Sequence, residues 1–277
     1  MHESILVYRG FRYLKLGAGM AAIAILAYAV HRPEVGPPNG GTALGYVLGA
    51  WGLGLIVWLA WFGVRKRRYG VGRRNLEDWL SAHVYLCLGL IVIATLHTGF
   101  QFGWNVHLLA YVLMMLVIAS GVFGVYAYAR YPALITENRR GMALREMLAQ
   151  IAELDAKARE ISATLGENIN GEVMAAAEAL RLGGSALRQL SGRDRNCPAA
   201  RALGRVRELA LDMPAGETEK VHQLIELLAR KVQFVERARR DLRFKAVMDV
   251  WLYVHVPLTF ALMAALTAHV VSVFFYW

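Results

Sequence analysis

Five stretches of the chain are apolar over lengths that match the hydrocarbon core of a lipid bilayer. A helix rises about 1.5 Å per residue, so roughly 20 apolar residues cross a core of about 30 Å. The stretches cover residues 14–30, 43–64, 79–99, 106–128 and 247–275. Hydrophobic residues make up 57% of the 277-residue sequence, which is typical of a membrane protein rather than a soluble one. We therefore predict an all-α membrane protein with five transmembrane helices that form one bundle.

The distribution of basic residues predicts the orientation of these helices. Basic residues are concentrated near the N-terminus and in residues 65–74 (RKRRYGVGRR), whereas residues 31–42 and 99–105 are nearly neutral. The positive-inside rule then places the N-terminus in the cytoplasm and the C-terminus in the periplasm of a bacterial-type inner membrane. The net charge of +10 indicates contact with anionic lipid. No nucleic-acid-binding motif accompanies it, so nucleic acid is not an expected partner.

Three segments follow from this pattern. Residues 1–129 contain the first four transmembrane helices, and residues 246–277 contain the fifth, which completes the bundle. Residues 130–245 form a cytoplasmic insert whose apolar residues recur every three or four positions, as in amphipathic helices. Helix breaks are predicted at GENING, GGS, SGRDRNCP and MPAGE. A cleaved signal peptide is the alternative interpretation of the first stretch, but we expect a retained helix.

Four histidines lie inside the third and fifth apolar stretches at equal spacing. His83 and His97 are fourteen positions apart, and so are His255 and His269. Fourteen residues turn an α-helix by about 1400°, close to four full turns, and advance it by about 21 Å. The two imidazoles of each helix therefore share one face and lie near opposite sides of the bilayer. Because the third and fifth helices run in the same direction, we expect His83 opposite His255 and His97 opposite His269.

Two imidazoles that face each other can bind the iron of a b-type haem from both sides. A neutral imidazole offers an unprotonated nitrogen to iron and a second nitrogen to a hydrogen-bond partner. We therefore predict two haem b groups. His83 and His255 are the predicted ligands of the cytoplasmic-side iron, and His97 and His269 of the periplasmic-side iron; no catalytic residue is predicted. Zinc is disfavoured, because its ligands cluster at one site.

The remaining cysteine, histidine and small residues are not predicted to bind a cofactor. Cys87 and Cys197 lie far apart, so a CxxC-based cluster or an attached c-type haem is excluded within this sequence. His107 is interpreted as a structural residue at the outer start of the fourth helix, with an approach to the periplasmic-side haem or a quinone as the alternative. Small residues in the middle helices are interpreted as packing positions: Gly45, Gly49, Gly52, Gly54, Gly89, Ser120, Gly121 and Gly124.

The paired histidines on the third and fifth helices resemble the ferric reductase-like transmembrane domain, which is shared with NADPH oxidases. They are also similar to the four histidines of the cytochrome b subunits in quinol-oxidising bc complexes. The resemblance implies a dihaem b-type cytochrome that transfers electrons across the membrane. It departs from ferric reductases because no GxGxxG motif follows a strand and because residues 130–245 replace a short loop. Reduction driven by NADPH is therefore not implied.

We expect an electron-carrier subunit of a multi-protein oxidoreductase rather than a self-contained enzyme. The expected partners are membrane lipid, a cytoplasmic iron–sulfur protein or flavoprotein, and a periplasmic electron carrier; quinone is a further candidate. One alternative is a membrane sensor or scaffold that signals through the cytoplasmic helices, with one haem or none. Another is a transporter whose histidines carry protons. Reduced-minus-oxidised absorbance separates these classes.

Overall fold

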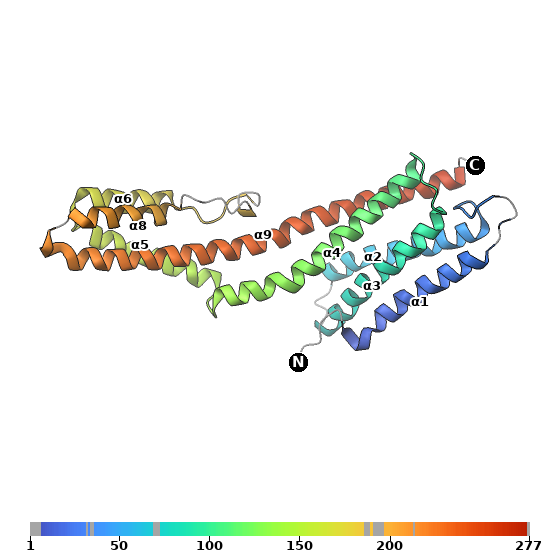
Figure 1. Cartoon of the computed structure of the whole chain (residues 1–277), viewed down its shortest axis with the longest axis horizontal. Helices are drawn as coiled ribbons and strands as arrows, with labels where there is room; N and C mark the ends of the chain where they lie inside the picture. Colours follow the sequence, from blue (N-terminus) through green and yellow to red (C-terminus); the bar gives the residue numbers. More distant parts are fainter. Residues whose placement is uncertain are drawn as a thin grey trace. The chain divides into compact units, whose positions relative to one another are not determined.

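The structure, a computed structural model, describes residues 7–31, 33, 36–68, 73–185, 189–190, 197–212 and 214–275. Over this part of the chain the regular structure is helical, and no β-strand occurs (Figure 1). Five helices are long and apolar enough to cross a membrane. This confirms the prediction of a helical chain with several potential membrane spans. Residues 69–72 of the basic loop, and the side chains of its other residues, lie outside the described part.

The chain divides into two compact units, which are described separately. Unit 1 comprises Met1–Val125 and Leu252–Trp277, and unit 2 comprises Tyr126–Trp251. The predicted insert, residues 130–245, falls within unit 2. Its cytoplasmic location stays a prediction.

Unit 1 is built from three complete helices and parts of two longer ones. The helices are α1 (Tyr8–Val30), α2 (Ala43–Arg68), α3 (Arg73–Thr98), the first part of α4 (Val106–Arg139) and the last part of α9 (Thr218–Phe275). The closest backbone packing in this unit joins α3 to α1 and to α2, as Figure 1 shows. α3 is therefore the central helix of this packing.

Glycines allow α1 and α3 to pack this closely. A Cβ atom added at Gly17 of α1 would lie 2.7 Å from the backbone oxygen of Tyr85 in α3, and one added at Gly89 would lie 3.1 Å from the backbone oxygen of Gly17. Real Cβ atoms essentially never approach another heavy atom within 3.0 Å. Gly17 therefore sets the distance between the two backbones.

We expect Gly17→Ala to lower the thermal midpoint of the full chain in detergent, because the new methyl group forces α1 away from α3. Overpacking of this kind costs roughly 1–3 kcal/mol. Gly19→Ala is the matched control, since a Cβ atom there meets no atom within 4 Å. Circular dichroism on heating measures both variants, and equal midpoints would show that Gly17 is not a packing constraint.

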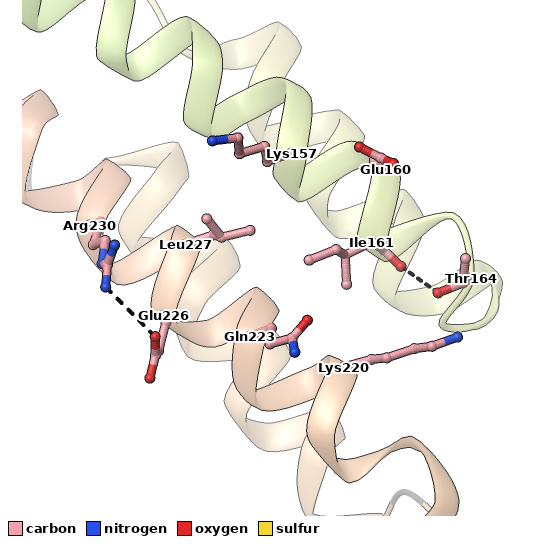
Figure 2. A pocket seen from close by; sticks show the side chains of 9 residues that line it. All are labelled: Lys157, Glu160, Ile161, Thr164, Lys220, Gln223, Glu226, Leu227 and Arg230. Carbon is pink, nitrogen blue, oxygen red and sulfur yellow. Dashed lines mark hydrogen bonds and ion pairs between the residues drawn. The ribbon is translucent and has the colours of Figure 1, made fainter.

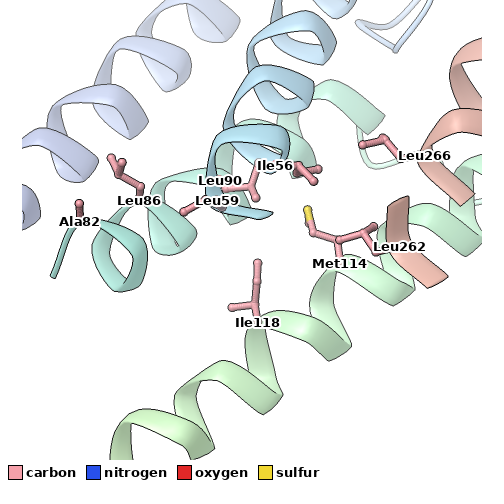
Figure 3. Close-up of a cluster of buried hydrophobic side chains, with 9 residues drawn as sticks. All are labelled: Ile56, Leu59, Ala82, Leu86, Leu90, Met114, Ile118, Leu262 and Leu266. Carbon is pink, nitrogen blue, oxygen red and sulfur yellow. The ribbon is translucent and has the colours of Figure 1, made fainter. Parts of the chain in front are cut away.

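The core of unit 1 is a layer of apolar side chains from four helices (Figure 3). α3 contributes Leu86 and Leu90, and α9 contributes Leu262 and Leu266. Each of these leucines is less than one-tenth exposed. The remaining members come from α2, α3 and α4: Ile56, Leu59, Ala82, Met114 and Ile118.

Unit 2 contains α5 (Leu144–Ser162), α6 (Gly166–Ala179), α8 (Pro198–Leu209) and the first part of α9, with two short 3₁₀ helices at Ala210–Asp212 and Ala215–Glu217. Its main apolar cluster draws on α5, α6, α8 and α9. Among the described residues of this unit, Lys231 and Asp241 are buried charged side chains, and each pairs with a more exposed partner: Lys231 with Asp155, and Asp241 with Arg139.

The break between α5 and α6 meets the start of the predicted segment GENING, since α5 ends at Ser162 and α6 begins at Gly166. Gly166 adopts the left-handed conformation, with φ of +67°, and the residues after it continue as α6. Glycine reaches this conformation at little cost, which suits Gly166 to the point where the chain enters α6, and the other residues of GENING are helical. α4 also continues eleven residues beyond the span predicted to end at position 128. α9 is continuous from Thr218 to Phe275, so the predicted boundary at residue 246 lies inside a helix.

Candidate functional site

The four predicted ligands lie on two helices of unit 1. His83 and His97 belong to α3, and His255 and His269 belong to α9. We call His83 and His255 the first pair, and His97 and His269 the second pair. Since fourteen residues correspond to nearly four helical turns, each helix presents its two imidazoles on one face.

The structure brings the imidazoles of the second pair together. The ring centroids of His97 and His269 are 6.0 Å apart, and the ring planes make an angle of 88°. Nδ1 of His97 lies 2.8 Å from the backbone oxygen of Gly45 in α2. A carbonyl oxygen can only accept a hydrogen bond, so Nδ1 of His97 carries the proton and donates it. In this neutral tautomer, Nε2 is the basic nitrogen of the ring.

Glycines of α2 and of the preceding loop surround the His97 ring. A Cβ atom at Gly49 would lie 2.8 Å from Cε1 and 3.0 Å from Nδ1 of His97, and one at Gly40 would lie 3.4 Å from Cε1. α2 begins after Thr42, whose hydroxyl accepts a hydrogen bond from the backbone N–H of Gly45, as an N-cap residue does. The helix start thus places both the Gly45 carbonyl and the Gly49 backbone against the imidazole.

In the first pair, His255 of α9 has a partner on α4. Nδ1 of His255 lies 2.7 Å from the hydroxyl oxygen of Ser120 in α4, and this hydroxyl donates to the backbone oxygen of Val117 at 2.8 Å. A serine hydroxyl has one hydrogen, so Nδ1 of His255 donates to Ser120. Nε2 is then the basic nitrogen of His255.

His83 is the least supported of the four imidazoles. Its Nδ1 atom is buried and has no hydrogen-bond partner in the structure. The ring of Phe62 packs on it, with centroids 5.2 Å apart. A buried polar atom without a partner costs free energy, and only a group that bound Nδ1 itself would remove that cost.

His107 joins the second pair. Its Nδ1 atom is 2.5 Å from Nδ1 of His269, and the two ring centroids are 4.6 Å apart. The sequence interpretation of His107 was a structural residue, with an approach to the periplasmic-side haem or a quinone as the alternative, and it named no contact with His269. Ser120, Gly45 and Gly49 were interpreted as packing positions, and the structure gives each of them a contact with a histidine ring.

The apolar core lies on the helix faces that carry the histidines. Leu86 and Leu90 follow His83 by three and seven residues, and Leu262 and Leu266 follow His255 by seven and eleven. Each of these spacings returns a helix to within about 60° of the same direction. Figure 3 draws these four leucines on α3 and α9. A water-excluding layer therefore lies between the first pair and the second pair along both helices.

The ring separation of the second pair fits a metal ion held between two imidazole nitrogens. Two rings on one metal ion have centroids about 6 Å apart, because each metal–nitrogen bond is about 2 Å long and each centroid lies about 1 Å behind its nitrogen. The second pair meets this distance. Over the described residues, no group of three or more His, Cys, Asp or Glu side chains is arranged to hold a metal ion. Paired ligation, as for haem iron, needs only two.

A surface groove lies in unit 2, between α5 and α9 (Figure 2). The groove is open, and its walls carry acidic and basic side chains. Glu226 and Arg230 form an ion pair, with 3.9 Å between the carboxylate oxygen and the guanidinium nitrogen. Small-molecule sites are usually enclosed and mostly apolar, which this groove is not. Its lining residues are Lys157, Glu160, Ile161, Thr164, Lys220, Gln223, Glu226, Leu227 and Arg230.

No known protein family, curated protein or solved structure matches the chain. The geometry of the histidines is therefore the basis for proposing a function.

Proposed function

We propose that this chain is a dihaem b-type membrane cytochrome that carries electrons across a bilayer, as the membrane subunit of a multi-protein redox complex. The observation that carries the proposal is the pairing of imidazoles from α3 and α9, with ring centroids 6.0 Å apart in the second pair. The five apolar helices support a location in a membrane.

In this proposal each histidine pair binds one haem iron from both sides. The Nδ1–H groups of His97 and His255 donate to Gly45 and Ser120, which fixes the orientation of each ring and keeps Nε2 available as the metal-binding nitrogen. A haem at each pair would supply the one-electron chemistry of its iron. The leucines of α3 and α9 exclude water between the two pairs, so the ligands act in a medium of low dielectric constant.

The proposed orientation follows from the basic residues near the N-terminus and in the loop at 65–74. With the N-terminus in the cytoplasm of a bacterial-type cell, the first pair lies near the cytoplasmic side and the second pair near the periplasmic side. Electrons then need a separate donor and acceptor, such as an iron–sulfur protein or flavoprotein on one side and an electron carrier or quinone on the other. The resemblance to the ferric reductase-like domain belongs to this proposal.

Haem content tests the proposal directly. We expect the purified full chain to hold about two haem b groups, one for each histidine pair. His97→Ala should remove one haem and leave the other spectrally intact, and His83→Ala should remove the other. Haem quantification and reduced-minus-oxidised absorbance measure both effects.

His222→Ala is the matched histidine control, because His222 is exposed in unit 2 and its Nδ1 bonds to the backbone oxygen of Thr218. This variant should keep both haems. A colourless wild-type protein after growth with excess haem would refute the proposal and favour the sensor or transporter interpretations. Full haem content in both alanine variants would refute the assigned ligands.

A further inference from the structure

The contact between His107 and His269 joins two elements that are far apart in the sequence. His107 lies in the first turn of α4, and His269 lies near the end of α9. Their Nδ1 atoms are 2.5 Å apart, and their ring planes are nearly perpendicular, at 89°. Two nitrogens at this distance share one hydrogen, so one ring donates and the other accepts.

The chemistry of a metal ligand decides which ring donates. A neutral imidazole that binds iron through Nε2 carries its proton on Nδ1, as the hydrogen bonds of His97 and His255 require in this structure. If His269 binds in the same way, its Nδ1–H donates to Nδ1 of His107. His107 is then neutral, with its own proton on Nε2.

We propose that His107 is a positioning residue for His269 and that it lowers the reduction potential of the haem at the second pair; this inference rests on the proposed function. The hydrogen bond holds the His269 ring in one orientation. It also increases the negative character of the ligand, which stabilises ferric iron relative to ferrous iron. His107 acts through His269 and does not itself touch the metal.

The hydrogen-bond acceptor of His269 differs in kind from the acceptors of His97 and His255. His97 donates to a backbone carbonyl, and His255 donates to the Ser120 hydroxyl. His269 instead donates to an imidazole, whose nitrogen is a stronger base than either oxygen. His107 is exposed and His269 is half-buried, so the acceptor can be replaced without opening the apolar core.

The test is a redox titration of the full chain in detergent, with His107→Ala and His107→Gln beside the wild type. Loss of the acceptor in His107→Ala should change the ferric-to-ferrous ratio of one haem by about tenfold, which raises its midpoint potential by about 59 mV for one electron. The other haem should be unchanged. The amide oxygen of glutamine can accept the hydrogen bond, so His107→Gln should restore much of the wild-type potential.

The outcomes separate this inference from the proposed function. Two haems with wild-type potentials in His107→Ala would overturn the inference and leave the dihaem proposal intact. A wild-type protein without haem would overturn the dihaem proposal itself. If His107→Ala loses one haem outright, recovery of that haem in His107→Gln supports the positioning role, and loss in both variants contradicts it.

Discussion

Replacing Gly49 by alanine is expected to remove the proposed haem of the second pair while the proposed haem of the first pair stays bound. The new Cβ atom would lie 2.8 Å from Cε1 and 3.0 Å from Nδ1 of His97, so the ring must move. It cannot move away from α2 without stretching its 2.8 Å hydrogen bond to the Gly45 oxygen. Ligand geometry tolerates little displacement. Haem quantification per chain and the difference spectrum measure the loss.

Gly54→Ala, one and a half turns further along α2, is the matched control because a Cβ atom at Gly54 meets nothing within 4 Å. Alanine in a helix interior is more stable than glycine by about 1 kcal/mol, so neither substitution weakens α2 itself. A loss of haem confined to Gly49→Ala must therefore come from the displaced ring. Two haems with unchanged spectra in Gly49→Ala would show that α2 does not position His97.

Helix periodicity made much of unit 1 predictable. The five apolar stretches and the fourteen-residue spacing of the histidines depend only on the geometry of one helix at a time. The same periodicity places Leu86 and Leu90 on the face of His83, and the structure buries both of them. Features that repeat within a single helix are therefore available from the sequence.

Contacts between helices were not predictable in the same way. The partner of His269 lies 162 residues earlier in the chain, and the partner of His255 lies 135 residues earlier. These contacts depend on how far each helix is rotated and shifted along its neighbour, which no local pattern specifies. Gly49 illustrates the difference. Its spacing from Gly45 predicts that a neighbouring helix approaches closely, but it does not predict that a histidine ring occupies the space.

The hydrogen-bond partners also differ between the two pairs. In the second pair, a carbonyl and an imidazole contact the two ligands. In the first pair, a serine hydroxyl contacts His255, and Nδ1 of His83 has no partner. Because such partners tune the ligands of a metal, we expect the two proposed haems to differ in potential, with the lower value at the second pair. Gly49→Ala should then remove the low-potential wave of a redox titration.

In unit 2, Asp155→Ala is expected to destabilise the protein by about 3–5 kcal/mol, the usual cost of removing one partner of a buried ion pair. Asp155 binds two cations: the ammonium group of Lys231 in α9, and the guanidinium group of Arg159, at 2.9 Å. The Lys231 side chain is only 1% exposed, so without Asp155 its charge remains buried and unpaired. Urea unfolding of the full chain in detergent, followed by circular dichroism, measures the change.

Glu153→Ala separates the effect of burial from the loss of a charge. Glu153 lies two residues before Asp155 on α5 and pairs with Lys157, but both side chains are more than half exposed. The hydrogen bond from Lys157 lowers the pKa of Glu153, so this pair stabilises the fold above the usual carboxyl pKa and loses its effect as the pH falls. Even at neutral pH the solvated pair contributes little.

Replacing Asp155 and Lys231 together by leucine and methionine should recover most of the stability lost in Asp155→Ala, because the buried charge is then gone. Equal unfolding midpoints for Asp155→Ala and Glu153→Ala would show that the Lys231 charge reaches water in the native state.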